Sequence, residues 1–220
     1  MSHGIVVNPR VGAAAAGVAE LEGLASSVIS DVTGRQVGTV GLRPVNRSPV
    51  SVCGNALTVK VRAGDNLLIY KALDMLQPGD VLVVDGEGDV TRALAGEILM
   101  RFARSRGAVG FVIDGAVRDV EAFEEHRFPC WSRGVSLRGP FKDGPGAVNV
   151  PIAVGGMVVH PGDVIVGDSD GVVAVPAAEA LQVAHLAREK ADAERAMMAE
   201  IADGTFSIAW VDAVLKHKGL

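Results

Sequence analysis

The fold is decided by residues 80–119, which read DVLVVDGEGDVTRALAGEILMRFARSRGAVGFVIDGAVRD. Two short apolar runs, Val81–Val84 and Val109–Ile113, are typical of strands buried on both faces of a sheet. The segment between them is long enough for a helix, so the stretch predicts a βαβ unit, with parallel strands and a right-handed crossover. Functional groups are expected at the carboxyl ends of these strands, which meet at one edge of the sheet.

The crossover helix is expected to span Thr91–Arg106. Leu94, Ile98 and Phe102 recur there at helical spacing and predict one apolar stripe. Gly107 stands where the helix should end, because glycine readily adopts the left-handed conformation at a helix C-terminus.

The flanking sequence predicts that an α/β fold continues around this unit. Upstream, the apolar spacing from Val18 to Val28 predicts one helix or two short ones, ended by Gly34. The other expected elements are strands within 50–61, 148–159, 164–166 and 172–175, and helices at 66–76, from Pro176 to about Ile201, and after Phe206. We expect residues 1–220 to form a single domain with a C-terminal helical segment at about 176–220.

One pattern occurs twice along the chain. Residues 78–85, PGDVLVVD, are repeated in outline by residues 161–168, PGDVIVGD. Pro followed by Gly suits a type II turn, because proline presets the first central dihedral and glycine accepts a positive φ at the second. We therefore expect two turn-strand units of one design in one sheet, although a Pro-Gly turn is common enough for the repeat to be coincidence.

Composition limits the classes of protein to consider. With 49% apolar and 21% charged residues, a chain of 220 residues is expected to be globular. The formal net charge of −5 argues against a nucleic-acid partner, since phosphate binding needs clustered Lys and Arg. No apolar run approaches the roughly 18 residues of a membrane-spanning helix. Two distant cysteines, Cys53 and Cys130, indicate neither a disulfide framework nor a zinc site, so a reducing cytoplasm is the expected location.

The chemistry is expected to lie around Gly96-Glu97 and Arg118-Asp119, which the βαβ unit brings to one edge of the sheet. Arg118 offers a planar fork for carboxylate or enolate oxygens. Asp119 and Glu97 supply the hard oxygen ligands that Mg²⁺ or Mn²⁺ prefers. The alternative is a surface Arg-Asp pair, with Glu97 serving only to favour a helix N-terminus.

The glycine-rich passage 85–89, DGEGD, is expected to join strand to helix and to offer backbone N–H groups to an anion. It is not a nucleotide-binding motif, because neither G-x-G-x-x-G nor a Walker Lys-Ser/Thr is present. A small carboxylic acid is the expected ligand.

Other mechanisms find less support. The five histidines are isolated, no G-x-S-x-G motif occurs, and neither cysteine has the local sequence of a nucleophile. Lys60 and Lys71 have the chemistry for a Schiff base, but nothing in the sequence marks either as desolvated.

These motifs resemble a known family. The motifs are Gly96-Glu97, followed after twenty residues by Arg118-Asp119, and two longer segments. These segments are GFVIDGAVRD (residues 110–119), which ends with Arg118-Asp119, and RGVSLRGP (residues 133–140). Together they resemble the 4-hydroxy-4-methyl-2-oxoglutarate aldolase and RraA-like (regulator of ribonuclease E activity A) family, from about Ser30 to Pro176.

The resemblance implies a three-layer mixed α/β sheet similar to the swivelling phosphohistidine domain, assembled as a homotrimer or a dimer of trimers. It implies that Asp119 binds Mg²⁺ (or Mn²⁺) directly and that Glu97 holds the ion through water, although the family usually has Asp at this position. Arg118 would stabilise the pyruvate enolate. The substrate carboxylate would contact the backbone from Gly96 through Glu97 and Ile98 to Leu99, with Asn66 lining the pocket. Glu194 of a neighbouring subunit, chosen over Glu189, would supply a further water-mediated contact to the metal.

The implied activity is that of a metal-dependent (class II) pyruvate aldolase, a carbon–carbon lyase that cleaves 4-hydroxy-4-methyl-2-oxoglutarate or a related 4-hydroxy-2-oxo acid. Oxaloacetate decarboxylation is the implied side activity, because it passes through the same enolate. The alternative is an RraA-like regulator that inhibits a ribonuclease by protein contact, since fold does not fix function. A menaquinone methyltransferase, a third label given to such chains, lacks the usual glycine-rich cofactor loop here and ranks last.

Overall fold

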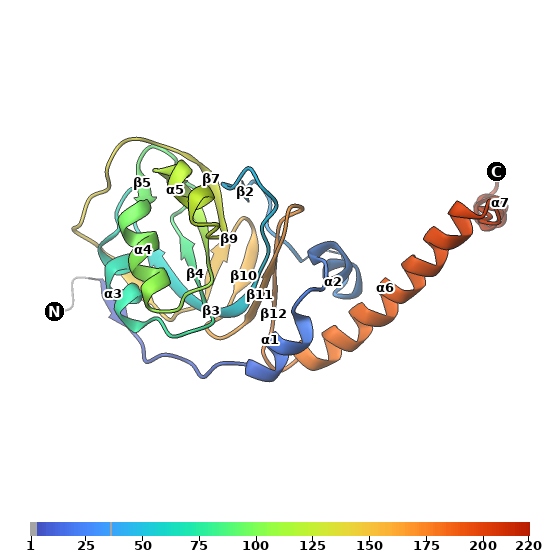
Figure 1. The fold of residues 1–220 in the computed structure, drawn as a ribbon, viewed down its shortest axis with the longest axis horizontal. Helices are drawn as coiled ribbons and strands as arrows, with labels where there is room; N and C mark the ends of the chain where they lie inside the picture. Colours follow the sequence, from blue (N-terminus) through green and yellow to red (C-terminus); the bar gives the residue numbers. More distant parts are fainter. Residues whose placement is uncertain (1–3, 36) are drawn as a thin grey trace.

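A mixed sheet of ten strands forms the centre of the computed structural model, which describes residues 4–35 and 37–220 (Figure 1). Seven strands follow the order β1-β8-β3-β4-β6-β7-β2, while β11 pairs with β3 and β12, and β5 pairs with β6. The ten strands are β1 (Ile5–Val7), β2 (Arg43–Pro44), β3 (Val52–Val61), β4 (Asp80–Asp85), β5 (Ala93–Ala95), β6 (Gly110–Val117), β7 (Cys130–Val135), β8 (Gly146–Val148), β11 (Val164–Gly167) and β12 (Val172–Val175). β9 (Ile152–Val154) and β10 (Met157–Val159) form a separate two-stranded sheet.

The helices gather around this sheet and extend beyond it. They are α1 (Ala15–Leu21), α2 (Ser26–Val32), α3 (Leu67–Met75), α4 (Glu97–Ser105), α5 (Val120–Glu125), α6 (Ala180–Ala202) and α7 (Trp210–His217). α3, α4 and α5 pack on one face of the sheet, over a core that includes Leu82 and Phe111. The β9–β10 hairpin covers the other face, around Trp131, and α1, α2 and α6 pack against β11 and β12.

The predicted βαβ unit is confirmed. β4 and β6 are adjacent and parallel, with Val81 opposite Gly110 and Asp85 opposite Asp114. β3 pairs with β4 in parallel on the other side, so three neighbouring strands end at the same edge. Every residue of β4 and β6 is buried, as expected for strands covered on both faces.

The crossover helix is shorter than predicted, and its predicted apolar stripe is wrong. Leu94 lies in β5, and α4 starts only after Gly96. Because the chain changes from strand to helix at Gly96, Leu94 is not in helical register with Ile98 and Phe102, which are 72% and 48% exposed. Leu99, Met100 and Ala103 form the buried face of α4 instead. Gly107, with φ +87°, follows the helix as predicted.

The remaining predictions are mostly confirmed. The first segment is a pair of short helices, followed by Gly34 at φ +90°, and α3 closely matches the predicted helix at 66–76. The segment 148–159 is broken into separate short strands, and the helix expected from Pro176 begins at Ala180 after a turn. β1, β2, β5, β7 and α5 were not predicted.

The two Pro-Gly units share one geometry in one sheet. Gly79 and Gly162 both have φ +86°. The amide of Asp80 donates to Gln77 O, and that of Asp163 donates to His160 O, each at 3.1 Å. Since β4 and β11 both pair with β3, the predicted repeat is confirmed as a structural repeat.

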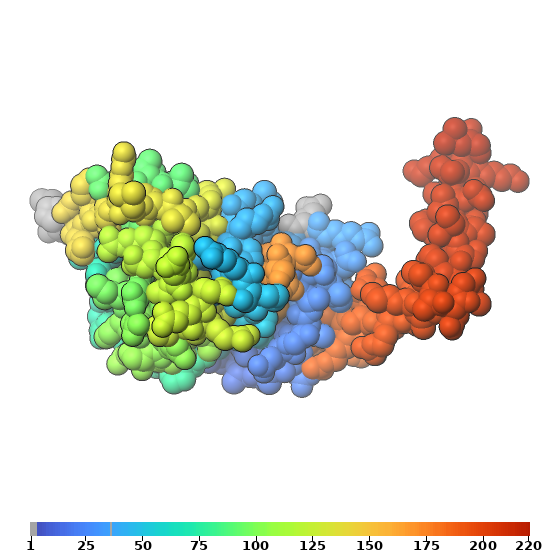
Figure 2. All heavy atoms as spheres, turned by 45° about the horizontal axis from the view of Figure 1, so that its top comes forward, coloured from blue at the N-terminus to red at the C-terminus, as the bar shows by residue number. Residues whose placement is uncertain are grey.

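The C-terminal helices form an arm that projects from the body (Figures 1 and 2). α6 packs on α1 and α2 through Ala180, Val183, Ala184 and Ala187, while α7 has no buried residue. Among the described residues, no helix combines the length and apolar character that crossing a membrane requires. The mixed α/β domain with C-terminal helices agrees with the predicted fold class, and the likeness to phosphohistidine domains stays a prediction.

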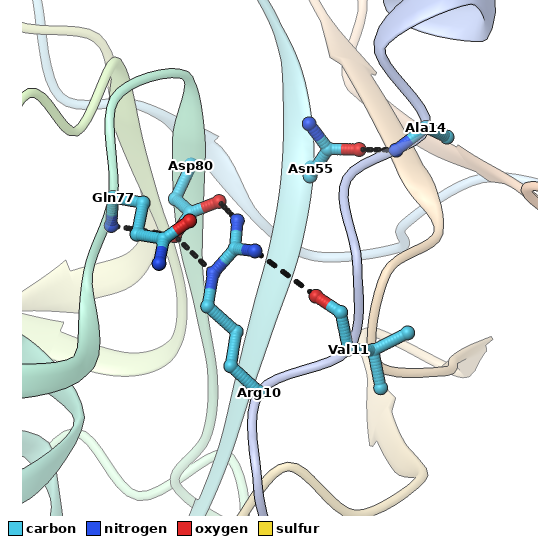
Figure 3. Close-up of polar contacts among 6 residues, drawn as sticks. All are labelled: Arg10, Val11, Ala14, Asn55, Gln77 and Asp80. Carbon is cyan, nitrogen blue, oxygen red and sulfur yellow. Dashed lines mark hydrogen bonds and ion pairs between the residues drawn. The ribbon is translucent and has the colours of Figure 1, made fainter.

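The segment before α1 is held to the sheet by side-chain bonds (Figure 3). Arg10 forms a two-pronged ion pair with Asp80, whose side chain is 1% exposed and also accepts the Gln77 amide at 2.9 Å. Asn55 Oδ1 accepts the Ala14 amide at 2.7 Å. These contacts hold the segment between β1, at the sheet edge, and α1 against β3 and β4.

Loss of the Arg10 guanidinium should strongly destabilise the fold. Arg10→Met leaves Asp80 buried without its cation, and we expect the free energy of unfolding to fall by about 3 kcal/mol in urea denaturation. In Arg10→Met/Asp80→Asn, the buried charge is absent, so at least part of the lost stability should return. A double variant no more stable than the single one would show that the unpaired charge is not the cause.

Candidate functional site

A small pocket opens where β5 and β6 end, between α3, α4 and the loop 139–146. Its cavity volume is about 50 Å³, within a space of about 350 Å³ that includes its open mouth. Of the predicted site residues, those that line it are Asn66, Gly96, Ile98, Leu99, Arg118 and Asp119. Three separate parts of the sequence therefore meet at the predicted edge of the sheet.

The Asp119 side chain links the end of β6 to the start of α4 in this site. This residue follows β6, precedes the first residue of α5 and has left-handed backbone angles (φ 55°, ψ 43°), a conformation that Asp tolerates better than most residues. Its Oδ2 accepts the Glu97 amide at 3.0 Å and lies 3.7 Å from Arg118 Nε. The start of α4 is thus fixed to the end of β6.

Gly96 makes this close approach possible. Its φ of −160° is ordinary extended backbone, so the need for glycine is one of space. A Cβ at position 96 would overlap Asp119 Oδ2 and lie 2.9 Å from Arg118 Cγ. Glycine at this position leaves room for both functional side chains.

The first turn of α4 offers backbone donors to the pocket. The first N–H groups of a helix have no intrahelical acceptor, and the helix dipole makes them attractive to anions. The Glu97 amide binds Asp119, whereas those of Ile98 and Leu99 have no acceptor among the described residues. Both residues line the pocket, where a carboxylate would satisfy their amides.

Asn66 contributes a buried polar group without a complete set of partners. It is 3% exposed, and its Nδ2 donates to Leu94 O at 2.9 Å. Its Oδ1 is buried and has no partner in the part of the chain that the structure describes. Because an unmade bond at a buried acceptor is costly, this oxygen suits a hydroxyl group or water in the pocket.

The Glu97 carboxylate does not line the pocket. It is paired along α4 with Arg101, with 2.8 Å between Oε1 and Nε, and its side chain is 41% exposed. Its backbone amide, not its carboxylate, contacts Asp119. The geometry therefore brings Arg118 and Asp119 together, while the predicted second acidic group points away from them.

The glycine-rich passage 85–89 is not an anion site, contrary to our prediction. The amides of Gly86 and Gly88 donate to Asp114 O, and that of Glu87 donates to Asp85 Oδ1. The prediction failed because β5 stands between this passage and α4, so the passage does not open a helix.

The loop that closes the pocket is anchored by Asp65. This side chain is fully buried and accepts the amides of Leu67, Asp143 and Gly144, at 2.9, 2.7 and 3.0 Å. Desolvation alone would raise the pKa of Asp65, but these three donors and Arg62 outweigh it and hold the pKa below its ordinary value. Asp65 thus connects the start of α3 to the loop 139–146.

Sequence reasoning missed the pocket residues Tyr70, Pro140 and Lys142. Tyr70 lies on the predicted helix at 66–76, one turn after Asn66, and this spacing was the available signal. The resemblance motif ends at Pro140, and nothing local in the sequence singled out Lys142.

The donors present fit a hard dication better than a transition metal. No group of three or more His, Cys, Asp or Glu lies close enough to share an ion within residues 4–35 and 37–220. Asp119 Oδ1 accepts no hydrogen bond there, so one carboxylate oxygen is available. Mg²⁺ is commonly held by one or two carboxylates with water and substrate oxygens as its other ligands, and this set suits it.

Glu194 lies on the arm, away from this pocket. Its Oε1 lies 2.8 Å from Lys190 Nζ, and the same Nζ lies 3.5 Å from Asp31 Oδ2. Its predicted role in a neighbouring subunit stays a prediction.

Comparisons with known proteins identify the family of this chain. The model of the RraA-like family, described as Aldolase/RraA, matches residues 25–174. The chain belongs to the RraA-like family. A relative in Halalkalibacterium halodurans, provisionally named a 4-hydroxy-4-methyl-2-oxoglutarate aldolase, is 41% identical over 170 residues, covering 77% of this chain and 80% of that protein.

Solved structures of other proteins share the fold. RraAS2 of Streptomyces coelicolor, described as an unusual member of the RNase ES inhibitor RraA family, has a TM-score of 0.77 at 26% identity and covers 88% of this chain and 100% of its own. A Geobacillus kaustophilus protein named as an S-adenosylmethionine:2-dimethylmenaquinone methyltransferase has a TM-score of 0.64 at 30% identity, covering 70% and 95%. Proteins of this fold thus carry the names of different functions.

Gly96→Ala should destabilise the protein, because the new Cβ would force Asp119 and Arg118 apart. We expect a loss of about 1–3 kcal/mol in urea denaturation, typical of an overpacked site. Gly12→Ala is the matched control, since a Cβ at position 12 meets no atom within 4 Å. Equal stability of the two variants would contradict the proposed steric role of Gly96.

Asp65 should make the stability of the fold sensitive to acid. A carboxyl group with a lowered folded-state pKa stabilises the protein above its ordinary pKa of about 4, and this contribution is lost as the pH falls through the folded value. The excess stability of wild type over Asp65→Asn should therefore be largest near neutral pH and shrink below about pH 4. A difference that is independent of pH would contradict this role.

Proposed function

We propose that this protein is a divalent-metal-dependent pyruvate aldolase that cleaves 4-hydroxy-4-methyl-2-oxoglutarate or a related 4-hydroxy-2-oxo acid, with oxaloacetate decarboxylation as a side activity. The observation that carries the proposal is the meeting of Arg118, Asp119 and the open amides of α4 in one small pocket. The resemblance to a named aldolase at 41% identity supports the same reaction.

Binding of the 2-oxo acid follows from the charges in the pocket. The amides of Ile98 and Leu99 are placed to receive the C1 carboxylate, because the helix N-terminus favours an anion. The Arg118 side chain, 42% exposed, lines the same pocket, and its guanidinium would pair with the 2-oxo oxygen.

Stabilisation of the enolate is the task we assign to Arg118. A base removes the proton of the C4 hydroxyl, so that C4 becomes a carbonyl carbon as the C3–C4 bond breaks. The electron pair of that bond forms the C2–C3 double bond, negative charge develops on the C2 oxygen, and a proton is then added at C3 to give pyruvate. A guanidinium that is already in place, held near Asp119, stabilises this charge without reorganisation. Removing one such donor typically lowers turnover by about 10²–10³-fold.

Asp119 is the residue that we propose to hold Mg²⁺ (or Mn²⁺), through its free Oδ1. When bound, the ion polarises the 2-oxo group and the carboxylate as a Lewis acid. The role of Glu97 is limited to water-mediated contact, which requires its carboxylate to leave Arg101. Asn66 Oδ1 is a suitable acceptor for a substrate hydroxyl, since it is buried and unpaired in the described chain.

Self-association as a trimer or a dimer of trimers is part of the proposal. α7 has eight residues and buries none of them, although Trp210, Val214 and Leu215 are apolar. A short helix of this kind is marginal in water unless another surface covers it. We infer that a second copy covers the arm, and Glu194 is our choice of the residue that it supplies to the neighbouring site.

Inhibition of a ribonuclease is the second candidate function. It is favoured by the likeness to RraAS2, which is described as a member of an RNase ES inhibitor family. The two roles make different demands, because a regulator that acts by protein contact does not need an ordered 2-oxo acid pocket.

Metal-dependent pyruvate release tests the proposed activity. With Mg²⁺ or Mn²⁺, wild type should release pyruvate from 4-hydroxy-4-methyl-2-oxoglutarate and oxaloacetate, and EDTA should abolish the reaction. Arg118→Ala and Asp119→Ala should each lower kcat/KM by about 10²-fold or more, because each loses an interaction with the developing charge or the ion.

Arg104→Ala serves as the matched control. This arginine is exposed on α4, and the one hydrogen bond that its side chain makes within the described chain goes to His126 O, at 3.4 Å, so turnover should be unchanged. Full activity of Arg118→Ala or Asp119→Ala, with its metal dependence retained, would exclude this pocket as the active site. Ribonuclease inhibition by a wild type that lacks lyase activity would favour the alternative.

A further inference from the structure

Arg92 lies just before β5, does not line the pocket and has no part in the mechanism described above. Its Nη1 donates to Gly139 O at 2.7 Å, and its guanidinium carbon lies 4.1 Å from the centre of the Phe141 ring. The stem of the side chain packs closely on backbone, because a Cβ at Gly64 would lie 3.0 Å from Arg92 Cδ. A cation at this distance from an aromatic ring is attracted to its face. Arg92 is therefore held at both its stem and its guanidinium.

The bond to Gly139 is the last link between two segments of the chain. The Ala93 amide donates to Arg138 O at 2.9 Å, so the chain just before Gly139 is held by backbone. The Arg92 side chain reaches Gly139 itself, which precedes the pocket residue Pro140. Loss of this side chain should consequently loosen the loop at the pocket and leave the preceding backbone bond in place.

The Arg118 guanidinium has few contacts that fix its position. It makes no hydrogen bond within the described chain, and its ion pair with Asp119 is loose, at 3.7 Å from Nε. A Cβ at Gly96 would lie 3.3 Å from Arg118 Nε, and a Cβ at Gly139 would lie 3.6 Å from Arg118 Nη1. These two glycines thus border the guanidinium at different nitrogens. Gly96 is part of the firmly held start of α4, whereas Gly139 is held by Arg92.

We propose that Arg92 is a positioning residue, which holds Gly139 beside the Arg118 guanidinium and so keeps that group in place for the negative charge of the enolate. The inference rests on the proposed function and adds to it a residue outside the pocket. A guanidinium that is already ordered loses less side-chain freedom when it pairs with the developing charge. Because this charge is greater in the transition state than in bound substrate, the effect of Arg92 falls on kcat more than on KM.

Steady-state kinetics of pyruvate release test this role. Arg92→Met removes the guanidinium and keeps a long stem. It should lower kcat by about 3- to 10-fold, the range for ordering one long side chain, and change KM by less than about 2-fold. Arg92→Lys retains a cation and a hydrogen-bond donor, so it should recover part of the lost kcat. An unchanged kcat in Arg92→Met would overturn the role.

Arg138→Met is the matched control for charge. Arg138 lies one residue before Gly139, is exposed, and its side chain makes no hydrogen bond or ion pair within the described chain. Its removal takes the same charge from the same loop, and kcat should stay as in wild type. If Arg138→Met lowered kcat as much as Arg92→Met, the effect would come from charge and not from the position of Gly139, and the role would be overturned.

A double-mutant cycle shows whether Arg92 acts through Arg118. In the Arg118→Met background, Arg92→Met should lower the remaining kcat by less than about 2-fold, because the group that it positions is absent. Urea denaturation of all four proteins ensures that each is assayed fully folded. An Arg92→Met effect of equal size with and without Arg118 would overturn the role, since a general structural defect acts in both backgrounds.

Calorimetry separates this inference from the proposed function. With Mg²⁺, Arg92→Met should weaken the binding of oxalate, a mimic of the enolate, by about 3- to 10-fold and that of pyruvate by less than about 2-fold. If wild type releases no pyruvate but shows this difference, and Arg118→Met abolishes it, the lyase proposal fails and the role of Arg92 stands. If Arg92→Met binds oxalate as wild type does, the role of Arg92 is overturned even where pyruvate is released. A wild type that neither releases pyruvate nor binds oxalate overturns both.

Discussion

The site depends on one short contact, the hydrogen bond from the Glu97 amide to Asp119 Oδ2. It joins the start of α4 to the end of β6, while the Arg118 amide bonds Ala95 O at 3.0 Å and joins β6 to β5. Both bonds require the two segments to approach closely, and Gly96 permits this because any side chain there would occupy the space of Asp119. A carboxylate, a guanidinium and open helix amides consequently converge at one edge of the sheet.

Charge balance within the pocket follows from this contact. Asp119 neutralises part of the positive potential of Arg118 and the helix N-terminus, and its second oxygen is left for a cation. On the opposite wall, buried Asp65 fixes the loop that carries Lys142 without facing the pocket itself. The protein has a formal net charge of −5, yet its pocket gathers cations and N–H donors, which matches a small anionic substrate.

The sequence was sufficient to predict those parts of the fold that are set by local pattern. The apolar runs of β4 and β6 and their parallel pairing were predictable, and this placed Arg118 and Asp119 at the same sheet edge as Gly96. The break at Gly96 was not, because Thr91–Arg106 fits a helical period as well as it fits a strand followed by a helix. Lys142 escaped notice because its position depends on Asp65, 77 residues earlier, and the orientation of Glu97 depends on its pairing with Arg101.

A crystal structure with Mn²⁺ and oxalate, a mimic of the pyruvate enolate, tests the central claim most directly. The account predicts an anomalous peak for manganese beside Asp119, with oxalate contacting the Arg118 guanidinium and the amides of Ile98 and Leu99. Manganese bound away from Asp119, or oxalate that touches neither Arg118 nor the start of α4, would contradict it.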